Sequence, residues 1–258
     1  MANTEIQRLN LDILIRNRGF KFTETFFHNA FGKIGPYYIW SDTVQKNGED
    51  YAFAIKSVAD IVEQIGGNEV ISGAEPKDYA FSYPVASRLR RPHLTIRKDG
   101  KLEGAYIRGK KVIHVGDLNK TGLIVQNLLV PAIEGAGGTI KNIVFYIDGM
   151  EDGVQLIKYL KINSHCVVPM DKFALEYLHE QRVIQNEESR INLMSYFENR
   201  HVWAVNMLKS PKGIDNLSRL FLGNAVSRER AQNILDIGYP EIASELKEKL
   251  ANKGLSFK

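Results

Sequence analysis

The sequence predicts an α/β protein with a mostly parallel sheet flanked by helices, followed by an all-helical C-terminal extension. Short runs of β-branched residues alternate with amphipathic stretches of helical length. Two central runs, KKVIHVGD (residues 110–117) and KNIVFYID (141–148), are apolar on both faces, as strands buried in a parallel sheet are. Beyond residue 209 the strand pattern is absent from the sequence, and only helical patterns follow.

The strands and helices of the main domain are expected to alternate along the chain. This order places helices on both faces of the sheet and a ligand at the carboxyl ends of the strands, where the strand order reverses. The expected strands are Glu69–Ser72, Leu94–Arg97, Val112–Gly116, Asn142–Asp148 and His165–Val168. The expected helices are Glu5–Asn17, Tyr51–Ile65, Pro84–Arg90, Gly122–Glu134 and Met170–Gln181.

The sequence suggests a boundary near SPKG at residues 210–213, which separates a domain of residues 1–209 from an extension of residues 210–258. Ser227 and Pro240 are typical helix-start residues. Two interpretations of the extension stay open: a cap that packs on the main domain or on a dimer partner, or a separate interaction module. Its expected helices are Ile214–Phe221, Ser227–Ile237 and Pro240–Asn252.

The composition is that of a globular protein, with 44% hydrophobic and 25% charged residues in a chain of 258. No apolar run reaches the roughly 18 residues that a membrane helix needs. The single cysteine, Cys166, excludes an internal disulfide and a cysteine-based zinc site, which favours a reducing cytoplasm. A net charge of +4 suits a small phosphate-rich substrate and is too weak to indicate nucleic acid. We therefore expect neither a nucleic acid nor a membrane as partner.

The most informative segment is the polar turn that follows the strand at residues 112–115. Its backbone N–H groups and the start of the next helix, near Thr121, form an arrangement suited to a phosphate. Gly122 permits close approach of the backbone. Asp117, at the carboxyl end of the strand, is placed to bind ribose hydroxyls or a magnesium ion. An ordinary strand–turn–helix connection is the alternative.

This segment resembles the phosphoribosyl diphosphate signature of type I phosphoribosyltransferases, and among them that of orotate phosphoribosyltransferases. The signature has two adjacent acids, of which Asp117 matches the second, while Gly116 replaces the first. Lys120 stands where the family has a threonine. The resemblance implies that phosphoribosyl diphosphate contacts Lys98, Asp117, Leu118, Asn119, Lys120, Thr121 and Gly122.

Upstream, the basic segment at residues 97–104 resembles the mobile catalytic loop of orotate phosphoribosyltransferases. Arg97, Lys98 and Lys101 match its cations, and Glu103 stands where the family has a histidine. Such cations meet the charge of the leaving diphosphate, and closure of the loop excludes water. The resemblance implies catalytic roles for Arg97, Lys101 and Asp117, and a homodimer, because the family's loop reaches a neighbouring subunit. A solvated basic hairpin is the alternative.

The base side shows both matches and departures. GKIGPYY resembles the family's N-terminal element, which implies that Tyr38 forms a wall for the base, and Ala30 occupies a position where many relatives have lysine. The segment after the strand at residues 142–148 resembles Asp-Arg-x-Glu-x-Gly, but Gly149 replaces the arginine that grips the carboxylate of orotate. Lys120 is the candidate replacement at the base, with contact to a phosphate or to solvent as the alternative.

One further segment, Ser82–Ala86, loosely resembles the family's pyrophosphate loop, with Lys77 as a nearby cation. Overall, the resemblance covers about residues 8–200. It implies Mg²⁺-dependent transfer of a 5-phosphoribosyl group from 5-phosphoribosyl 1-diphosphate to a pyrimidine-type base, orotate by default, with Asp117 as the candidate metal ligand. Gly116, Glu103 and Gly149 leave two alternatives open: a regulator that binds phosphoribosyl diphosphate or nucleotides, and a phosphoribosyltransferase for another base.

Overall fold

The structure is a computed structural model that describes residues 4–29, 32–67 and 69–256, and this part of the chain forms two compact units. Unit 1 comprises the described residues up to Gly19 together with Trp40–Glu180, and unit 2 comprises Phe20–Ile39 and the described residues from Gln181 onward. The predicted boundary between residues 209 and 210 falls inside unit 2, and a division of the chain there stays a prediction. Ala30 lies outside the described residues.

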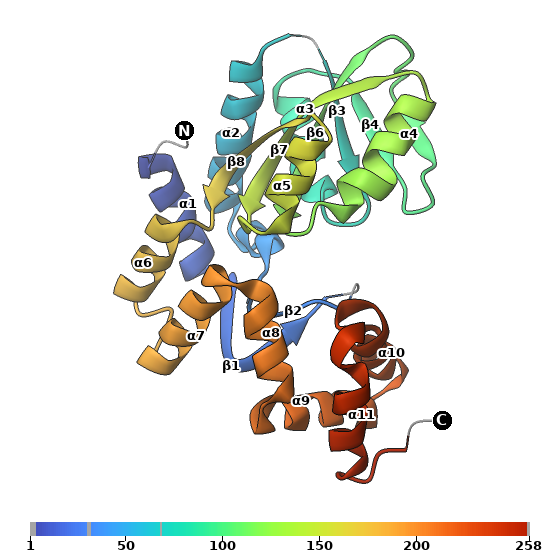
Figure 1. The fold of residues 1–258 in the computed structure, drawn as a ribbon. Helices are drawn as coiled ribbons and strands as arrows, with labels where there is room; N and C mark the ends of the chain where they lie inside the picture. Colours follow the sequence, from blue (N-terminus) through green and yellow to red (C-terminus); the bar gives the residue numbers. More distant parts are fainter. Residues whose placement is uncertain (1–3, 30–31, 68, 257–258) are drawn as a thin grey trace. The chain divides into compact units, whose positions relative to one another are not determined.

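Unit 1 is built on a sheet of six described strands in the order β5-β4-β3-β6-β7-β8 (Figure 1). Neighbouring strands are parallel except for β4 and β5, so the predicted mostly parallel sheet is confirmed. The chain moves outward from β3 to β5 and then returns to β6, which makes the gap between β3 and β6 the point where the order reverses. The strands are β3 (Val70–Ala74), β4 (His93–Ile96), β5 (Leu102–Gly104), β6 (Lys111–Asn119), β7 (Thr139–Asp148) and β8 (Asn163–Pro169).

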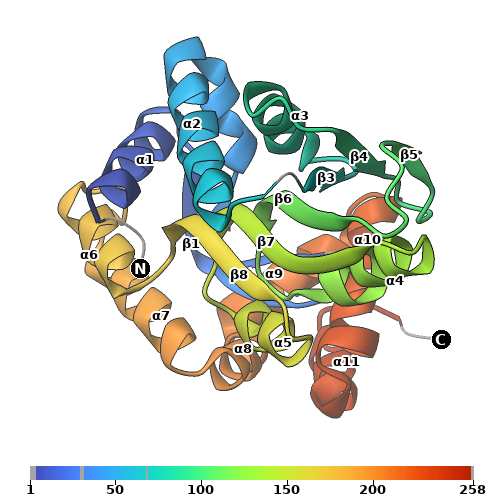
Figure 2. The same cartoon turned by 90° about the horizontal axis from the view of Figure 1, so that it is seen from above.

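Helices cover both faces of this sheet, as the alternating pattern predicts (Figure 2). On one face lie α1 (Thr4–Arg16), α2 (Gly48–Ile65), which the 3₁₀ turn η1 (Ser41–Lys46) precedes, and α3 (Tyr79–Arg88). On the other face lie α4 (Val130–Gly135), which the π-helical turn η2 (Val125–Leu129) precedes, and α5 (Asp152–Tyr159); α6 (Lys172–Glu180) packs beside α1. The side chains between the sheet and α4 and α5 form an apolar core that includes Val112, Ile133, Ile143 and Ile157.

The end of β6 differs from the prediction. The strand was expected to stop at Gly116, but it continues to Asn119, because Leu118 and Asn119 pair with Ile147 and Asp148 on the longer neighbour β7. The polar turn that follows is therefore limited to residues 120–122. Pairing with a distant strand sets this boundary, and the local sequence does not encode it.

The predicted pyrophosphate loop is also placed differently. Ser82–Ala86 lies inside α3, which begins at Tyr79 and tolerates Pro84 in its first turns. The loop that follows β3 consists of residues 75–78 instead. The interpretation of Ser82–Ala86 as a loop was wrong.

Unit 2 combines an antiparallel hairpin, β1 (Phe20–His28) and β2 (Ile34–Ile39), with C-terminal helices. Residues 210–256 of the described chain contain helices and turns without a strand, as predicted. The hairpin, α7 and α8 were not predicted; the apolar residues of α7 and α8 follow the helical period poorly. The helices and turns are α7 (Glu187–Glu198), α8 (Arg200–Lys209), α9 (Pro211–Leu222), α10 (Ala225–Asn233), η3 (Ile234–Gly238), η4 (Pro240–Ile242) and α11 (Ala243–Ala251). Among the described helices, none combines the length and apolar character needed to cross a bilayer.

Candidate functional site

The loops that follow β3, β6 and β7 meet at the carboxyl edge of the sheet in unit 1, beside the point where the strand order reverses. In open α/β sheets this is the usual place for a ligand. These loops comprise residues 75–78, 120–122 and 149–151, and they include several of the residues that the sequence singled out.

Asp117 lies near the end of β6 and is partly exposed. Its carboxylate accepts a hydrogen bond of 2.7 Å from the hydroxyl of Ser41, and its backbone N–H donates one of 3.0 Å to Oδ1 of Asp78. Burial and the neighbouring Asp78 carboxylate raise the pKa of Asp117 to about 7, against the opposing influence of Ser41 and Lys77. A carboxyl group in this state both accepts and donates hydrogen bonds near neutral pH, which suits hydroxyl groups as partners.

The turn at residues 120–122 is tightly packed. Gly122 has a φ of 69°, and a Cβ there would lie 3.1 Å from the Cα of Gly153. The backbone N–H of Gly153 donates to the carbonyl of Lys120 at 2.7 Å. The helix begins directly after the turn and passes into η2, and π-helical turns occur frequently at functional sites. The helix start and the glycine agree with the predicted phosphate turn, but the turn is shorter than expected.

Two other predicted ligand contacts belong to β6 itself. Asn119 is 3% exposed and donates from its side-chain amide to Asp148 at 2.9 Å, so this amide already has a protein partner. Leu118 is partly buried and pairs with Ile147 in the sheet. Their contacts with a ligand stay predictions.

Lys120 and Gly149 are brought together by the loops after β6 and β7. A Cβ at position 149 would lie 3.3 Å from Cγ of Lys120, and Nζ of Lys120 lies 3.4 Å from a carboxylate oxygen of the buried Glu151. Lys120 therefore stands beside the position where the family pattern has arginine. Its ammonium group forms an ion pair with Glu151.

The basic segment forms an ordered hairpin turn between β4 and β5. The backbone N–H of Arg97 donates to the carbonyl of Lys101 at 2.9 Å, and Gly100 takes a φ of 83° in the turn. Nη2 of Arg97 donates to Glu103 at 2.7 Å, and Arg97 also lies 3.6 Å from Glu75. Nζ of Lys101 lies 3.7 Å from Glu103. The hydrogen bond from Arg97 lowers the pKa of Glu103, so this carboxylate is firmly ionised and offsets both cations.

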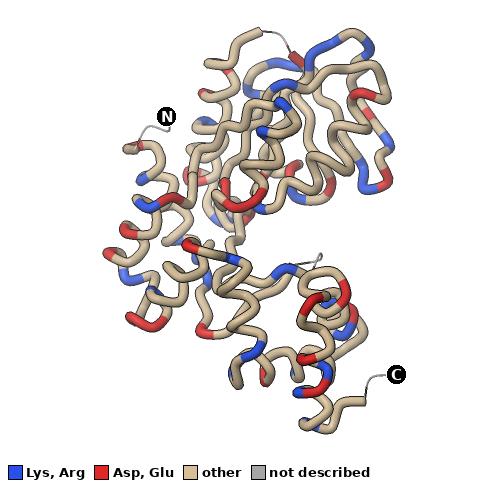
Figure 3. Tube along the Cα trace, viewed as in Figure 1, with Lys and Arg blue, Asp and Glu red and all other residues tan. Residues whose placement is uncertain are grey.

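Lys98 is exposed, and its backbone N–H donates to Glu75 at 3.3 Å. Figure 3 shows that Lys and Arg segments alternate with Asp and Glu segments in unit 1. The hairpin is therefore a mixed-charge element in which Arg97 and Lys101 form exposed ion pairs with neighbouring glutamates.

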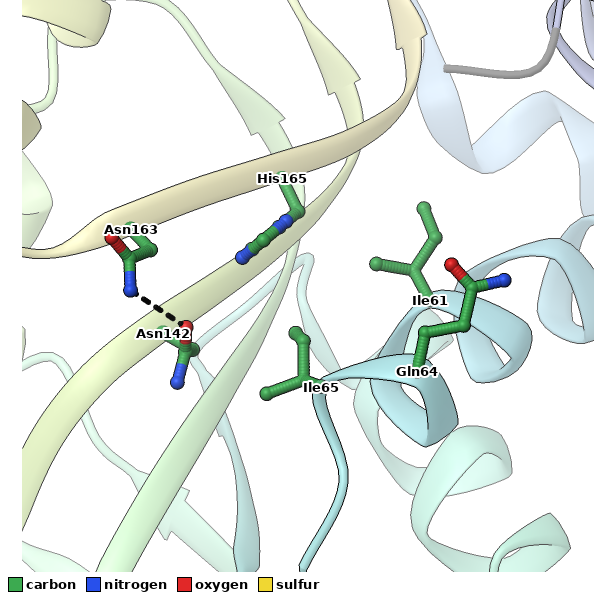
Figure 4. Close-up of a pocket in the computed structure, with 6 residues that line it drawn as sticks. All are labelled: Ile61, Gln64, Ile65, Asn142, Asn163 and His165. Atoms are coloured by element: carbon green, nitrogen blue, oxygen red, sulfur yellow. Dashed lines mark hydrogen bonds between the residues drawn. The ribbon is translucent and has the colours of Figure 1, made fainter. Parts of the chain in front are cut away.

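Tyr38, the predicted base wall, lies on β2 in unit 2, where its ring contacts Phe27 edge-on with 6.0 Å between centroids. Its role at the base stays a prediction. In unit 1 the structure shows a hollow at the amino ends of β7 and β8, near the end of α2 (Figure 4). It lies at the edge of the sheet opposite the loops described above and includes none of the predicted site residues. Its lining residues are Ile61, Gln64, Ile65, Asn142, Asn163 and His165.

Sequence reasoning missed Ser41 and Asp78, although both contact Asp117. Asp78 follows Pro76 and Lys77 and directly precedes α3, so its local pattern indicates a helix N-cap. Its side chain instead accepts from Asp117, which is distant in the sequence. The residues around Ser41 form no motif that indicates a role at the site.

No protein-family model matches the chain. The chain is 26% identical to the orotate phosphoribosyltransferase of Sulfolobus acidocaldarius over 167 residues, which cover 62% of this chain and 84% of that protein. It is 27% identical to the adenine phosphoribosyltransferase of Ruminiclostridium cellulolyticum over 141 residues, which cover 46% of this chain and 82% of that protein.

Solved structures show the same fold. Leishmania donovani UMP synthase matches with a TM-score of 0.66 at 17% identity, over 74% of this chain and 42% of that longer one. The orotate phosphoribosyltransferase of Aeropyrum pernix matches with a TM-score of 0.59 at 17% identity, over 66% of this chain and 99% of that one. With the sequence relatives, the parallel sheet and the strand–turn–helix segment at Asp117, these comparisons show that the chain is similar to type I phosphoribosyltransferases.

Proposed function

We propose that the protein transfers the 5-phosphoribosyl group from 5-phosphoribosyl 1-diphosphate to a nitrogenous base, with orotate as the first candidate, in nucleotide biosynthesis or salvage. In this reaction the anomeric C–O bond to diphosphate breaks, the diphosphate leaves with the electron pair, and a ring nitrogen of the base forms the new C–N bond and gives up its proton to water or to the diphosphate. The observation that carries the proposal is Asp117 at the end of β6, held by Ser41 and followed by a tight turn and a helix start.

The described side chains divide between the parts of this substrate. We assign the ribose hydroxyls to Asp117 and the 5-phosphate to the backbone of residues 120–122 and the helix that follows. Arg97, Lys98 and Lys101 are assigned to the diphosphate. Because Glu103 and Glu75 already neutralise two of these cations, diphosphate must displace them, and the hairpin must rearrange as the site closes.

Magnesium fits this arrangement only together with the substrate. Among residues 4–29, 32–67 and 69–256, no group of three or more His, Cys, Asp or Glu side chains could hold a metal ion alone. Mg²⁺ commonly binds through one or two carboxylates, water and substrate phosphates. We therefore propose Asp117 as its protein ligand, with the diphosphate supplying the remaining anionic oxygens. Bound in this way, the ion would neutralise charge on the leaving group.

The identity of the base is a more specific part of the proposal. Lys120 beside Gly149 supports an acidic base such as orotate, whereas the ion pair with Glu151 weakens that preference. The test is diphosphate release with Mg²⁺ and orotate, uracil or adenine, measured for wild type, Lys120→Ala and the exposed control Lys172→Ala. Turnover with orotate that falls in Lys120→Ala alone supports the assignment. Equal orotate titrations of wild type and Lys120→Ala would remove Lys120 from the base site.

A second candidate is a protein that binds phosphoribosyl diphosphate or nucleotides as a regulator, without turnover. The pairing of Arg97 and Lys101 with Glu103 favours it, because these cations are not free to meet a leaving group. A ligand at 100 times its dissociation constant stabilises a protein by about 2.7 kcal/mol. Thermal stabilisation by phosphoribosyl diphosphate without diphosphate release, for every base tested, would select this candidate.

The assembly is part of the same proposal. We propose a cytoplasmic homodimer without a nucleic acid or membrane partner, in which the hairpin between β4 and β5 serves the site of the neighbouring subunit. Light scattering during size-exclusion chromatography tests the dimer. Mixing an Asp117→Asn variant with an Arg97→Ala variant tests the shared site, because activity would return only if the two residues serve one site from different subunits.

A further inference from the structure

We propose that Asp78 is a positioning residue for Asp117, and that it supplies, from the loop after β3, the second carboxylate that position 116 lacks. This inference rests on the proposed function, in which Asp117 binds the ribose hydroxyls. Asp78 lies in the loop of residues 75–78 that follows β3, and Asp117 lies near the end of β6; the strand order reverses between β3 and β6.

Asp78 is fixed by hydrogen bonds from two strands. Oδ1 accepts the backbone N–H of Asp117 at 3.0 Å, while Oδ2 accepts the backbone N–H of Ala74 at 3.0 Å and lies 3.1 Å from Nε2 of His114. The side chain of Asp78 is only 13% exposed. A carboxylate that accepts from several N–H groups is held in one orientation. Asp78 thus ties the loop after β3 to the end of β6.

A second layer supports Asp78 from inside the sheet. His114 is 1% exposed, and its Nδ1 lies 3.1 Å from the hydroxyl of Ser72, its partner in the register of β3 and β6. If Nε2 donates to Asp78, Nδ1 is the acceptor and Ser72 the donor, so each polar group has a partner. Buried polar networks whose members are all paired are rigid. The chain from Ser72 to Asp78 therefore holds the carboxylate in place.

The structure also explains why position 116 carries no acid. Side chains alternate along a strand, so a side chain at position 116 would point to the same face as His114. A Cβ there would lie 2.8 Å from two carbons of the Phe145 ring and 3.4 Å from Oδ1 of Asp78. Phe145 is buried and pairs with Gly116 across β6 and β7. The space that an acid at position 116 would enter is already taken by the Phe145 ring and the Asp78 carboxylate.

The consequence for binding is specific. Asp78 holds the backbone of Asp117, and Ser41 holds its side chain, so the Asp117 carboxylate is presented in one orientation. Removal of Asp78 should therefore weaken recognition of the ribose hydroxyls through Asp117, and leave the 5-phosphate contacts at residues 120–122 in place.

The test compares two ligands that differ at the ribose. Dissociation constants of ribose 5-phosphate and 2-deoxyribose 5-phosphate are measured by calorimetry for wild type, Asp78→Ala, Asp78→Asn and the control Asp50→Asn. Wild type is expected to prefer the ribose compound by about tenfold or more, which corresponds to one hydrogen bond to a charged group. Asp78→Ala should reduce this ratio to about twofold or less, and Asp78→Asn, which keeps one acceptor oxygen, to an intermediate value. Asp50→Asn removes a buried carboxylate that pairs with the partly exposed Arg16, away from the loop, and should leave the ratio unchanged.

The outcomes separate this inference from the proposed function. A merely structural role for Asp78 would weaken both ligands equally, and an unchanged ratio in Asp78→Ala and Asp78→Asn would overturn the inference. If Asp78→Ala does not fold, the ratio in Asp78→Asn decides in the same way. Failure of wild type to bind either compound would instead overturn the assignment of Asp117 to ribose, and the inference with it.

Discussion

A single methyl group at position 116 is expected to destabilise unit 1. In Gly116→Ala the new Cβ would lie 2.8 Å from two ring carbons of Phe145, whereas carbon atoms in contact are about 3.5–4.0 Å apart. The ring must therefore move by roughly 0.7 Å or more. Overpacking of this kind costs about 1–3 kcal/mol, and the reduced entropy of the unfolded chain offsets about 0.4–1 kcal/mol. We expect a net loss of roughly 1–2 kcal/mol.

The assay is thermal and urea unfolding followed by circular dichroism. A loss of that size lowers the melting temperature by about 2–8 °C for a protein of this length. The matched control is Gly135→Ala at the end of α4, where the added Cβ would have no atom of the described residues within 4 Å apart from its chain neighbours and the backbone of its own helix. This control should be as stable as wild type or more stable. A Gly116→Ala variant that is as stable as wild type would refute the packing argument.

A double variant tests whether the Phe145 ring is the cause of the lost stability. Phe145→Leu removes the ring and is itself destabilising, because it leaves a cavity in the core. If the ring is what excludes a side chain at position 116, the cost of Gly116→Ala should fall by about 1 kcal/mol in the Phe145→Leu background. Additive effects of the two changes would mean that the residues do not compete for the same space.

Three further predictions concern charge and burial. The hydrogen bond from Arg16 lowers the pKa of Asp50 below its ordinary value of 3.8, so Asp50→Asn should lower the free energy of unfolding by about 1–2 kcal/mol at pH 7. In urea unfolding, the difference from wild type should shrink as the pH falls below 4. A constant difference down to pH 2 would contradict this prediction. Tyr146 is fully buried, and its hydroxyl has no hydrogen-bond partner among the described residues. The free energy of unfolding of Tyr146→Phe should therefore be the same as that of wild type or higher by up to about 1 kcal/mol. A clear loss of stability would be evidence against this. Glu103→Gln should bind pyrophosphate severalfold more tightly by calorimetry, because Arg97 loses its carboxylate partner; weaker binding would show that Glu103 does not compete with the anion.

Much of the sheet could be predicted because its central strands carry their signal locally. β6 and β7 are apolar on both faces, and only a position between two helical layers buries both. The acid at the end of β6 and the glycine that begins the next helix are likewise visible in one short segment. These features were sufficient to predict the fold, whereas the role of Asp117 stays a prediction.

The remaining parts of the site depend on contacts between distant segments. β6 extends to Asn119 because β7 is long enough to pair with it, and nothing within residues 116–122 reveals that. The local sequence around Asp78 indicates a helix N-cap, yet its carboxylate accepts a hydrogen bond from the backbone N–H of Asp117, which lies on β6. The departure at position 116 appeared in the sequence as a lost acid, and its physical reason, the Phe145 ring, becomes visible only when β6 and β7 are side by side.

The most direct test of the central claim is a crystal structure of the protein with 5-phosphoribosyl 1-diphosphate and Mg²⁺. We expect the 5-phosphate on the backbone of residues 120–122 and a ribose hydroxyl within about 2.6–3.2 Å of the Asp117 carboxylate. A ligand bound elsewhere, or a turn at residues 120–122 that stays closed against Gly153 with no phosphate on it at saturating ligand, would contradict the claim.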